Sequence, residues 1–197
     1  LLILSASLLL PALASAADRP FTPRYSTNVN GQIIIAANTI MQCPTTTVDP
    51  LLNSGCAGAR AGANGRNNNT LDMGWIDVDS DTSTFNSSSA QLLLPRTGRV
   101  LFAGLYWTGL QKKAAVITGA NGYKGTPVAP PDVTAIGSVQ LAVPGVEGYK
   151  TITASQVDTG PIAEGSGFSA FADVTRLVNA AGAGTYTVAN LQTGTGG

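Results

Sequence analysis

The sequence predicts an all-β fold, a jelly-roll-like β-sandwich with one short helical turn. Short runs rich in β-branched residues recur along the chain, and Gly, Pro, Asn and Ser separate them. Only 11% of the residues are charged, whereas 23 of 197 are glycine, so long helices with Glu and Lys faces are not expected. Short strands joined by turns are typical of β-sandwiches and jelly rolls.

The chain opens with a segment that has the features of a secretory signal peptide. Residues 1–13 are almost wholly apolar, and Ala14-Ser15-Ala16 matches an A-x-A cleavage site. The apolar stretch is too short to span a membrane, so we expect no span in the mature chain. We interpret residues 1–16 as part of a signal peptide and residues 17–197 as one β-sandwich domain, truncated at its C-terminus. The mature protein is expected to be secreted or extracellular and associated with the cell surface.

Eight segments are predicted as strands from β-branched content and bounding turn residues. Residues 44–70 predict a long surface loop, and the one helical candidate covers residues 172–180. Alternation along the strands places seven side chains in the predicted core. The predicted strands are residues 32–41, 71–78, 90–94, 99–107, 114–118, 138–143, 150–155 and 185–191. The predicted core residues are Ile33, Ile35, Leu101, Leu105, Trp107, Val139 and Val188.

The two cysteines, Cys43 and Cys56, predict a disulfide that ties down this loop. In an exported chain, an even number of cysteines is usually paired. A bridge around a loop of this size contributes about 3 kcal/mol in the chain-entropy model. The rival interpretation, a tetrahedral metal site, fails because the chain contains no histidine and no third cysteine.

Residues 94–98, LPRTG, have the form of a sortase sorting signal. Such a signal is followed by an apolar segment of about 20 residues, long enough to span a membrane. The apolar run at residues 100–110 is about half that length and is interrupted by Gly104, Thr108 and Gly109. We therefore predict a turn at residues 95–98, in which Pro presets φ and Gly relieves the end of the turn.

Residues 118–125, TGANGYKG, have the glycine spacing of a dinucleotide-binding loop. That loop must lead into a helix, whose N-terminus faces the pyrophosphate. Three prolines within residues 127–131 are incompatible with such a helix. We interpret the segment as a Gly-rich loop.

Asp77, Asp79 and Asp81 form a candidate Ca²⁺ patch. In an extended chain, alternate side chains point to one side. Three carboxylates repel one another unless a hard cation or hydroxyl donors neutralise them, and Ca²⁺ prefers such oxygen clusters. The pattern is not an EF-hand, because Thr82 stands where its glycine is required. The alternative is an acidic strand end whose side chains cap backbone amides.

Composition excludes several function classes. Without histidine, Ser-His-Asp and Cys-His catalysis are excluded within this sequence, and the two glutamates, Glu147 and Glu164, lie in turn-like contexts. The formal net charge of +0 gives no broad attraction to nucleic acid or anionic lipid. We therefore expect a protein that is not an enzyme and does not bind nucleic acid.

Asn190 is an unusual polar residue at the end of a core-like strand. We expect its amide to hydrogen-bond to neighbouring backbone, because buried polar groups are nearly always paired. The alternative is an intramolecular isopeptide bond of the kind found in surface proteins, formed with one of the four lysines. These are Lys112, Lys113, Lys124 and Lys150.

Several segments together resemble a known family of surface proteins. The segments are residues 24–31 (RYSTNVNG), 77–90 (DVDSDTSTFNSSSA), 101–109 (LFAGLYWTG), 154–158 (ASQVD), 171–178 (FADVTRLV) and 184–190 (GTYTVAN). They resemble the N-terminal domain of large exported bacterial surface proteins, adhesin-like, whose later portions carry β-sandwich repeats of unknown function. The resemblance implies no active site. It implies downstream repeats of the same chain as partners, together with surface glycans or host and cell-wall components.

A looser likeness concerns residues 168–178, FSAFADVTRLV. This segment is similar to the ending of galactose-binding-like jelly rolls, where a short helical turn feeds a final strand. The likeness implies that Asp173 or Thr175 caps that turn.

The sequence thus predicts a non-catalytic structural or adhesive module, stiffened by calcium if the aspartate patch binds it. The alternative function is a carbohydrate-binding module of a secreted multidomain protein. Such sites use exposed aromatic platforms, for which Tyr106, Trp75 and Tyr123 are the candidates. A secreted enzyme domain would require catalytic residues outside this sequence.

Overall fold

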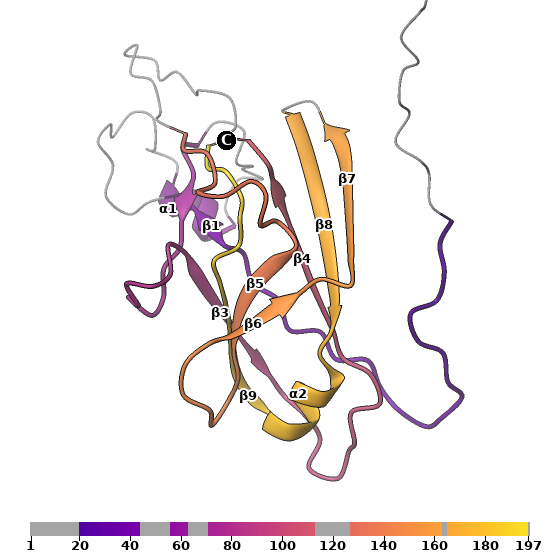
Figure 1. Ribbon diagram of the computed structural model, residues 1–197. Coiled ribbons are helices and arrows are strands. Elements are labelled where there is room, and N and C mark those ends of the chain that lie inside the picture. Colours follow the sequence, from indigo (N-terminus) through magenta and orange to yellow (C-terminus); the bar gives the residue numbers. More distant parts are fainter. Residues whose placement is uncertain (1–19, 44–55, 63–70, 113–126, 163–164, 197) are drawn as a thin grey trace, which may run out of the picture.

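The computed structural model describes residues 20–43, 56–62, 71–112, 127–162 and 165–196 (Figure 1). These residues form a mostly β structure with antiparallel sheets and two short helices, as the all-β prediction requires at this coarse level. The strands are β1 (Met41–Gln42), β2 (Gly74–Trp75), β3 (Ser87–Leu92), β4 (Gly104–Leu110), β5 (Ser138–Ala142), β6 (Lys150–Thr153), β7 (Gln156–Ile162), β8 (Gly165–Asp173) and β9 (Gly184–Ala189). The helices are α1 (Cys56–Arg60) and α2 (Thr175–Ala181).

The strands form three sheets. A four-stranded sheet has the order β3-β9-β5-β6, a three-stranded sheet has the order β4-β8-β7, and β1 pairs with β2. Every pairing is antiparallel. The edge strands are therefore β3 and β6 in the four-stranded sheet, and β4 and β7 in the three-stranded sheet.

The main core joins the two larger sheets. Trp107 of β4 and Phe168 of β8 share a buried cluster with Val139 of β5 and with Leu191. The indole Nε1 of Trp107 donates to the carbonyl of Ile136 at 2.9 Å, so the ring buries its apolar surface without leaving its N–H unpaired. A second cluster packs α2 against the four-stranded sheet, with Leu141, Val143, Val174 and Val178 buried together.

The segment 191–196 is buried, although its sequence, LQTGTG, is mostly polar. Its backbone is held by distant parts of the chain. The Gly194 N–H donates to the Leu110 carbonyl at 3.0 Å, and the Thr195 N–H donates to the Val128 carbonyl at 2.8 Å. The indole of Trp75 donates to the Thr193 carbonyl at 2.9 Å. Because its polar groups are paired, the segment can lie in the interior without a large desolvation cost.

The predicted core is partly confirmed. Trp107 and Val139 are buried, and Leu105 and Val188 are half-buried and packed against the core. The core prediction is wrong for three residues. Leu101 is 37% exposed, because β4 begins three residues after it. Ile33 is 93% exposed and Ile35 is 84% exposed.

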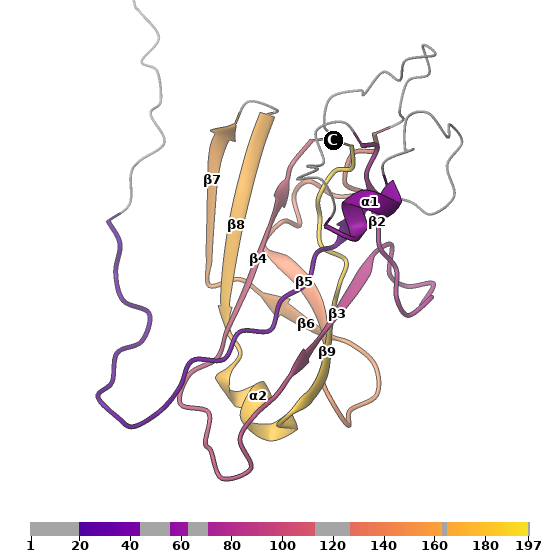
Figure 2. The ribbon, with the colours of Figure 1, turned by 180° about the vertical axis from the view of Figure 1, so that it is seen from behind.

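The isoleucines are exposed because the strand predicted at residues 32–41 does not form. Only Met41 and Gln42 pair, with β2, and residues 20–40, here called the N-terminal arm, contain no regular strand. Figure 2 shows the arm crossing from the lower end of β4 past β3 to β1. The β-branched run has strand propensity, but a strand also needs a partner for its backbone groups, and propensity alone does not supply one.

The other strand predictions fare better. The strands predicted at residues 138–143, 150–155 and 185–191 are confirmed within two residues as β5, β6 and β9. Those at 71–78, 90–94 and 99–107 overlap β2, β3 and β4 with shifted ends. The turn predicted at residues 95–98 is confirmed, because the Gly98 N–H donates to the Pro95 carbonyl at 3.2 Å. The helix predicted at 172–180 begins later, at Thr175.

The hairpin of β7 and β8 was not predicted. It pairs Gln156 with Phe171 and continues to Ile162 opposite Gly165. Gly160, Pro161 and Gly165 are typical of turns, and they obscured a pair of long strands. Pro161 is compatible with the ladder because β7 is an edge strand.

Predictions that fall on other residues lie outside the described part of the chain. They are the signal peptide at residues 1–16, the strand at 114–118, the Gly-rich loop at 118–125, most of the loop at 44–70, and Lys113, Tyr123, Lys124 and Glu164.

Candidate functional site

The loop between β2 and β3 carries the three predicted calcium ligands. The carboxylate of Asp77 accepts a hydrogen bond from Ser87 Oγ at 2.8 Å. Asp81 Oδ1 accepts the backbone N–H of Ser83 at 2.9 Å and the Ser83 hydroxyl at 2.8 Å. Asp79 Oδ1 accepts the Asp81 N–H at 3.1 Å. The sequence pattern thus produces turns stabilised by side chains, in which hydroxyl and amide donors satisfy the carboxylates.

Asp79 also joins this loop to a distant part of the chain. Tyr149, just before β6, donates its hydroxyl to Asp79 Oδ2. Burial acts to raise the pKa of Asp79, but the hydrogen bonds from Tyr149 and from the Asp81 N–H outweigh it and hold this pKa below the ordinary value. Burial and the hydrogen bond to the Asp79 carboxylate raise the pKa of Tyr149.

Calcium binding at this loop stays a prediction. Among the described residues, no group of three or more His, Cys, Asp or Glu side chains is arranged to hold a metal ion. The sequence left two ways of neutralising the three carboxylates, a cation or hydroxyl donors. The structure shows hydroxyl donors: Ser87 bonds to Asp77, Tyr149 to Asp79 and Ser83 to Asp81.

A second candidate site is an aromatic patch on the sheet of β4 and β8, formed by Phe102, Tyr106 and Phe171. Tyr106 lies opposite Phe171 in the register, with ring centroids 5.0 Å apart. Phe102 stacks on Phe171 at 6.3 Å. Tyr106 is 59% exposed, so the patch faces outward, away from the core that holds Trp107.

Gly104 makes room for this patch. A Cβ at this position would lie 2.8 Å from Tyr106 Cε2 and 2.9 Å from Phe171 Cε2. Any side chain larger than hydrogen would therefore displace one of the two rings. The glycine allows the aromatic rings to spread over the strand.

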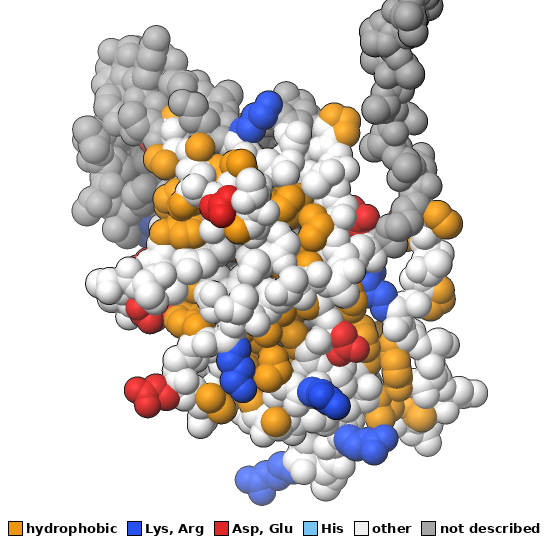
Figure 3. All heavy atoms as spheres, viewed as in Figure 1, with side chains coloured by type: hydrophobic (Ala, Val, Ile, Leu, Met, Phe, Trp, Pro, Cys, Tyr) orange, Lys and Arg blue, Asp and Glu red, His pale blue; other side chains and the backbone are white. Residues whose placement is uncertain are grey.

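The N-terminal arm covers part of the aromatic patch. The guanidinium of Arg24 lies over the ring of Phe171, 4.3 Å from its centroid, and 5.3 Å from the centroid of Tyr106. Tyr25 stacks on Phe102 with a centroid distance of 5.3 Å and an interplanar angle of 7°. Cation–π contacts of this kind are worth about 0.5–1 kcal/mol at exposed positions. Figure 3 shows hydrophobic side chains gathered where the arm meets the body of the molecule.

The candidate carbohydrate platforms differ in their surroundings. The indole N–H of Trp75 donates to the Thr193 carbonyl, and its ring meets Phe85 edge-on at 4.9 Å. These contacts give Trp75 a structural role in holding the segment 191–196. Tyr106 is the candidate with an exposed ring among the described residues.

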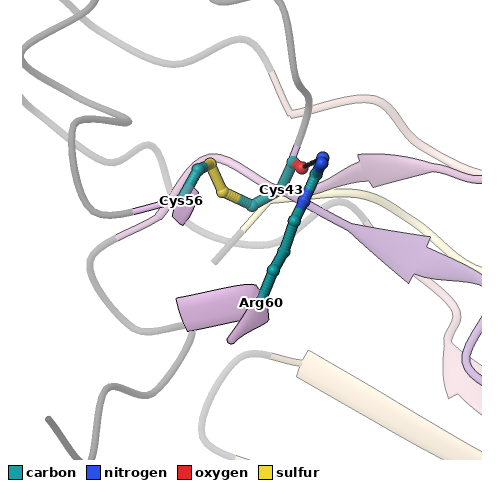
Figure 4. Close-up of a disulfide and its surroundings, with 3 residues drawn as sticks. All are labelled: Cys43, Cys56 and Arg60. Carbon is teal, nitrogen blue, oxygen red and sulfur yellow. Dashed lines mark hydrogen bonds between the residues drawn. A yellow bond between two sulfur atoms is a disulfide. The ribbon is translucent and has the colours of Figure 1, made fainter. Parts of the chain in front are cut away.

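The disulfide predicted between Cys43 and Cys56 is present (Figure 4). The two Cα atoms are 5.7 Å apart, a normal separation for a bridge. Both cysteines are buried with Leu71 in a small cluster, and the side chain of Arg60 reaches from α1 to donate to the Cys43 carbonyl. The bridge fixes the start of α1 to the end of β1.

Two further sequence predictions concern single residues. The amide of Asn190 hydrogen-bonds to backbone, as expected: Oδ1 accepts the Phe85 N–H at 3.0 Å and Nδ2 donates to the Ser83 carbonyl at 3.3 Å. The N-cap prediction for α2 is wrong in position, because Val174 occupies the cap. Asp173, one residue before the cap, accepts the Thr175 N–H at 2.9 Å. Hydrogen bonding to the side chain of Thr175 and to its N–H lowers the pKa of Asp173.

Comparisons with known proteins identify no relative: no protein-family model, no curated protein and no solved structure matches the chain. In the part of the chain that the structure describes, no helix has the length and apolar character needed to cross a membrane.

Proposed function

We propose that this chain is a non-catalytic structural or adhesive module of an exported bacterial cell-surface protein. The observation that carries the proposal is the Cys43–Cys56 disulfide. Disulfides form and persist in oxidising compartments, including the extracellular space and the bacterial periplasm, and are rare in the cytosol. The apolar leader with its A-x-A site supports the same route.

The proposed architecture is a jelly-roll-like sandwich of the two larger sheets. Its support is the buried cluster to which β4, β5 and β8 contribute together. Antiparallel sheets that share one core form a stiff unit, suited to spacing or presenting a binding surface. The proposed partners are further β-sandwich repeats of the same protein, and glycans, host components or cell-wall components outside it.

The test is labelling of intact producing cells with a membrane-impermeant biotin reagent, followed by capture of the chain. If the chain is a surface module, it is labelled before lysis and migrates differently on gels with and without reductant. Labelling only after lysis, together with free thiols at Cys43 and Cys56, would overturn the proposal. A cytosolic protein of the same cells serves as the control for membrane integrity.

A second function, carbohydrate binding, is favoured by one observation: Tyr106 presents an exposed ring beside the Arg24 guanidinium. Sugars stack their apolar faces on aromatic rings, and guanidinium groups donate to their hydroxyls. The described arrangement offers both groups from different parts of the chain.

Glycan capture tests this second function. We expect a binding module to retain bound glycan and to lose it on Tyr106→Ala, with the melting temperature unchanged. Val146→Ala, at an exposed position between β5 and β6, is the matched control. Equal capture by wild type and Tyr106→Ala would exclude the aromatic patch as the glycan site.

A further inference from the structure

The aromatic patch is built to receive an extended segment that carries an arginine and an aromatic ring. In the structure this segment is the chain's own arm, through Arg24 over Phe171 and Tyr25 on Phe102. The contacts are made by side chains, and the sequence of the arm here, Pro20-Phe-Thr-Pro-Arg-Tyr25, is compatible with an extended conformation. Any copy of the chain could present the same two side chains to the same patch.

The part of the arm that follows is loosely attached. Residues 26–33 are exposed and Ile34 is half-buried, and Asn38 Nδ2 donates to the Ser89 carbonyl at 2.7 Å. An extended segment from residue 26 to residue 37 reaches about 40 Å, at roughly 3.3 Å per residue. That reach is enough for Arg24 and Tyr25 to contact a neighbouring molecule while Asn38 stays in place.

The segment from residue 26 to residue 37 also exposes apolar side chains to solvent. Ile33 and Ile35 are exposed, and in an extended chain they lie on one side. No charged side chain occurs between Arg24 and Asp49, so nothing repels a second copy of the segment laid against it. Uncharged, β-branched, exposed segments of this kind are prone to pair with another strand.

We propose that two copies of this chain exchange their N-terminal arms. Arg24 and Tyr25 of each copy occupy the aromatic patch of the other. Residues 31–37 of the two arms pair antiparallel, about a two-fold axis perpendicular to the strands. The exchange reproduces the contacts of Arg24 and Tyr25 with the aromatic patch and leaves Asn38 on Ser89, and it also covers Ile33 and Ile35. Self-association of this kind goes beyond the proposed function, which concerns location and the absence of catalysis.

The first measurement is the molar mass of the oxidised chain by light scattering over about a hundredfold range of concentration. We expect a dimer that dissociates on dilution. Ile33→Lys combined with Ile35→Lys places like charges opposite each other and should raise the dimer dissociation constant by about tenfold or more. Val146→Lys is the control at an exposed apolar position outside the arm. A monomer at all concentrations, or a dimer equally tight in the double variant, overturns the proposal.

Mixing two variants distinguishes a dimer with exchanged arms from a dimer in which each arm stays on its own molecule. One variant, Phe102→Ala with Tyr106→Ala, loses the ring that stacks on Tyr25 and one of the two rings beside Arg24. Another, Arg24→Ala with Tyr25→Ala, loses the arm contacts. Under exchange, their mixture retains one intact arm-to-patch contact in each mixed dimer, whereas the patch variant alone retains only the contact of Arg24 with Phe171 and the arm variant alone retains none. We therefore expect the mixture to dimerise more tightly than either variant alone. A mixture no tighter than its components shows that the arm binds only its own molecule.

Discussion

Asn86 and Leu191 are joined by two hydrogen bonds although 105 residues separate them. Asn86 Nδ2 donates to the Leu191 carbonyl at 2.9 Å, and the Leu191 N–H donates to Asn86 Oδ1 at 3.0 Å. The asparagine side chain acts in place of a neighbouring strand, and it is fully buried where β3 begins. It connects β3 to the chain that leaves β9.

Asn86→Ala is expected to destabilise the fold strongly. The substitution leaves the buried N–H of Leu191 without a partner, at a cost of about 1–3 kcal/mol. The Leu191 carbonyl loses one of two donors and keeps the Thr193 N–H at 2.9 Å. Urea unfolding of the two proteins measures the loss. Asn179→Ala is the control, since Asn179 also bonds to backbone through its side chain but is exposed; it should change stability by about 0.5 kcal/mol or less. Equal effects of the two substitutions would contradict the structural role of Asn86.

Gly109 and Gly160 form a second matched pair. A Cβ at Gly109 would lie 2.6 Å from Thr193 Cβ and 2.9 Å from Phe168 Cε1, whereas nothing lies within 4 Å of one at Gly160. Gly109→Ala should therefore lower the free energy of unfolding by about 1–3 kcal/mol through overpacking. Gly160→Ala, also in a strand, should be neutral or slightly stabilising. Thermal unfolding of both variants tests the difference, and a stable Gly109→Ala protein would show that Thr193 can move aside.

The Asp79–Tyr149 hydrogen bond predicts a pH dependence with a definite sign. The pKa of Asp79 is lower in the folded chain than its ordinary value of 3.8, so the folded state holds the proton less tightly than the unfolded state. The resulting stabilisation is present above pH 3.8 and is lost as the pH falls below it, through the folded pKa. Tyr149→Phe should make the melting temperature less sensitive to acid over this interval.

Tyr149 contributes on the alkaline side. Its pKa is raised in the folded chain above the ordinary value of 10.0, so its contribution is present below pH 10.0 and is lost as the pH rises through the folded pKa. Melting temperatures of wild type and Tyr149→Phe at both extremes provide the measurement. Parallel pH profiles for the two proteins would show that the hydrogen bond does not form in solution.

Calorimetry with and without CaCl₂ tests the aspartate loop. Because hydroxyl and amide donors already satisfy Asp77, Asp79 and Asp81, we expect the melting temperature to be insensitive to calcium. A rise of several degrees that Asp77→Asn abolishes would establish the calcium site suggested by the spacing of the carboxylates. Magnesium serves as the control for ionic strength, since it binds poorly to flexible oxygen sites.

The sequence predictions were accurate where an element depends on residues close together in the sequence, and inaccurate where it depends on pairing with distant residues. β5 and β9 were recognised because alternating apolar residues and nearby turn residues mark them locally. Residues 32–41 have the composition of a strand, yet whether they pair depends on an edge elsewhere in the molecule. The β7–β8 hairpin shows the opposite case, because pairing along its whole length overrides several turn-forming residues.

The same distinction applies to the candidate sites. The disulfide was predictable because the chain has one pair of cysteines. The aspartate hydrogen bonds to Ser83 and Ser87 are local and match the capping alternative, whereas the Tyr149 contact spans 70 residues. The aromatic patch was missed apart from Tyr106. Arg24 and Phe171 lie far apart in the sequence, and no local pattern indicates their contact.

The buried segment 191–196 has a consequence for how the chain reaches its folded state. Its hydrogen bonds close loops of 118 residues to Trp75, 105 to Asn86 and 67 to Val128. Contacts this distant make folding slow, because the entropy of closing each loop is lost before the contact forms. Ribosomes add about 5–20 residues per second, so several seconds pass between the synthesis of Trp75 and that of Thr193. During that interval the core cannot close, because Leu191 and the segment that follows it are not yet part of the chain.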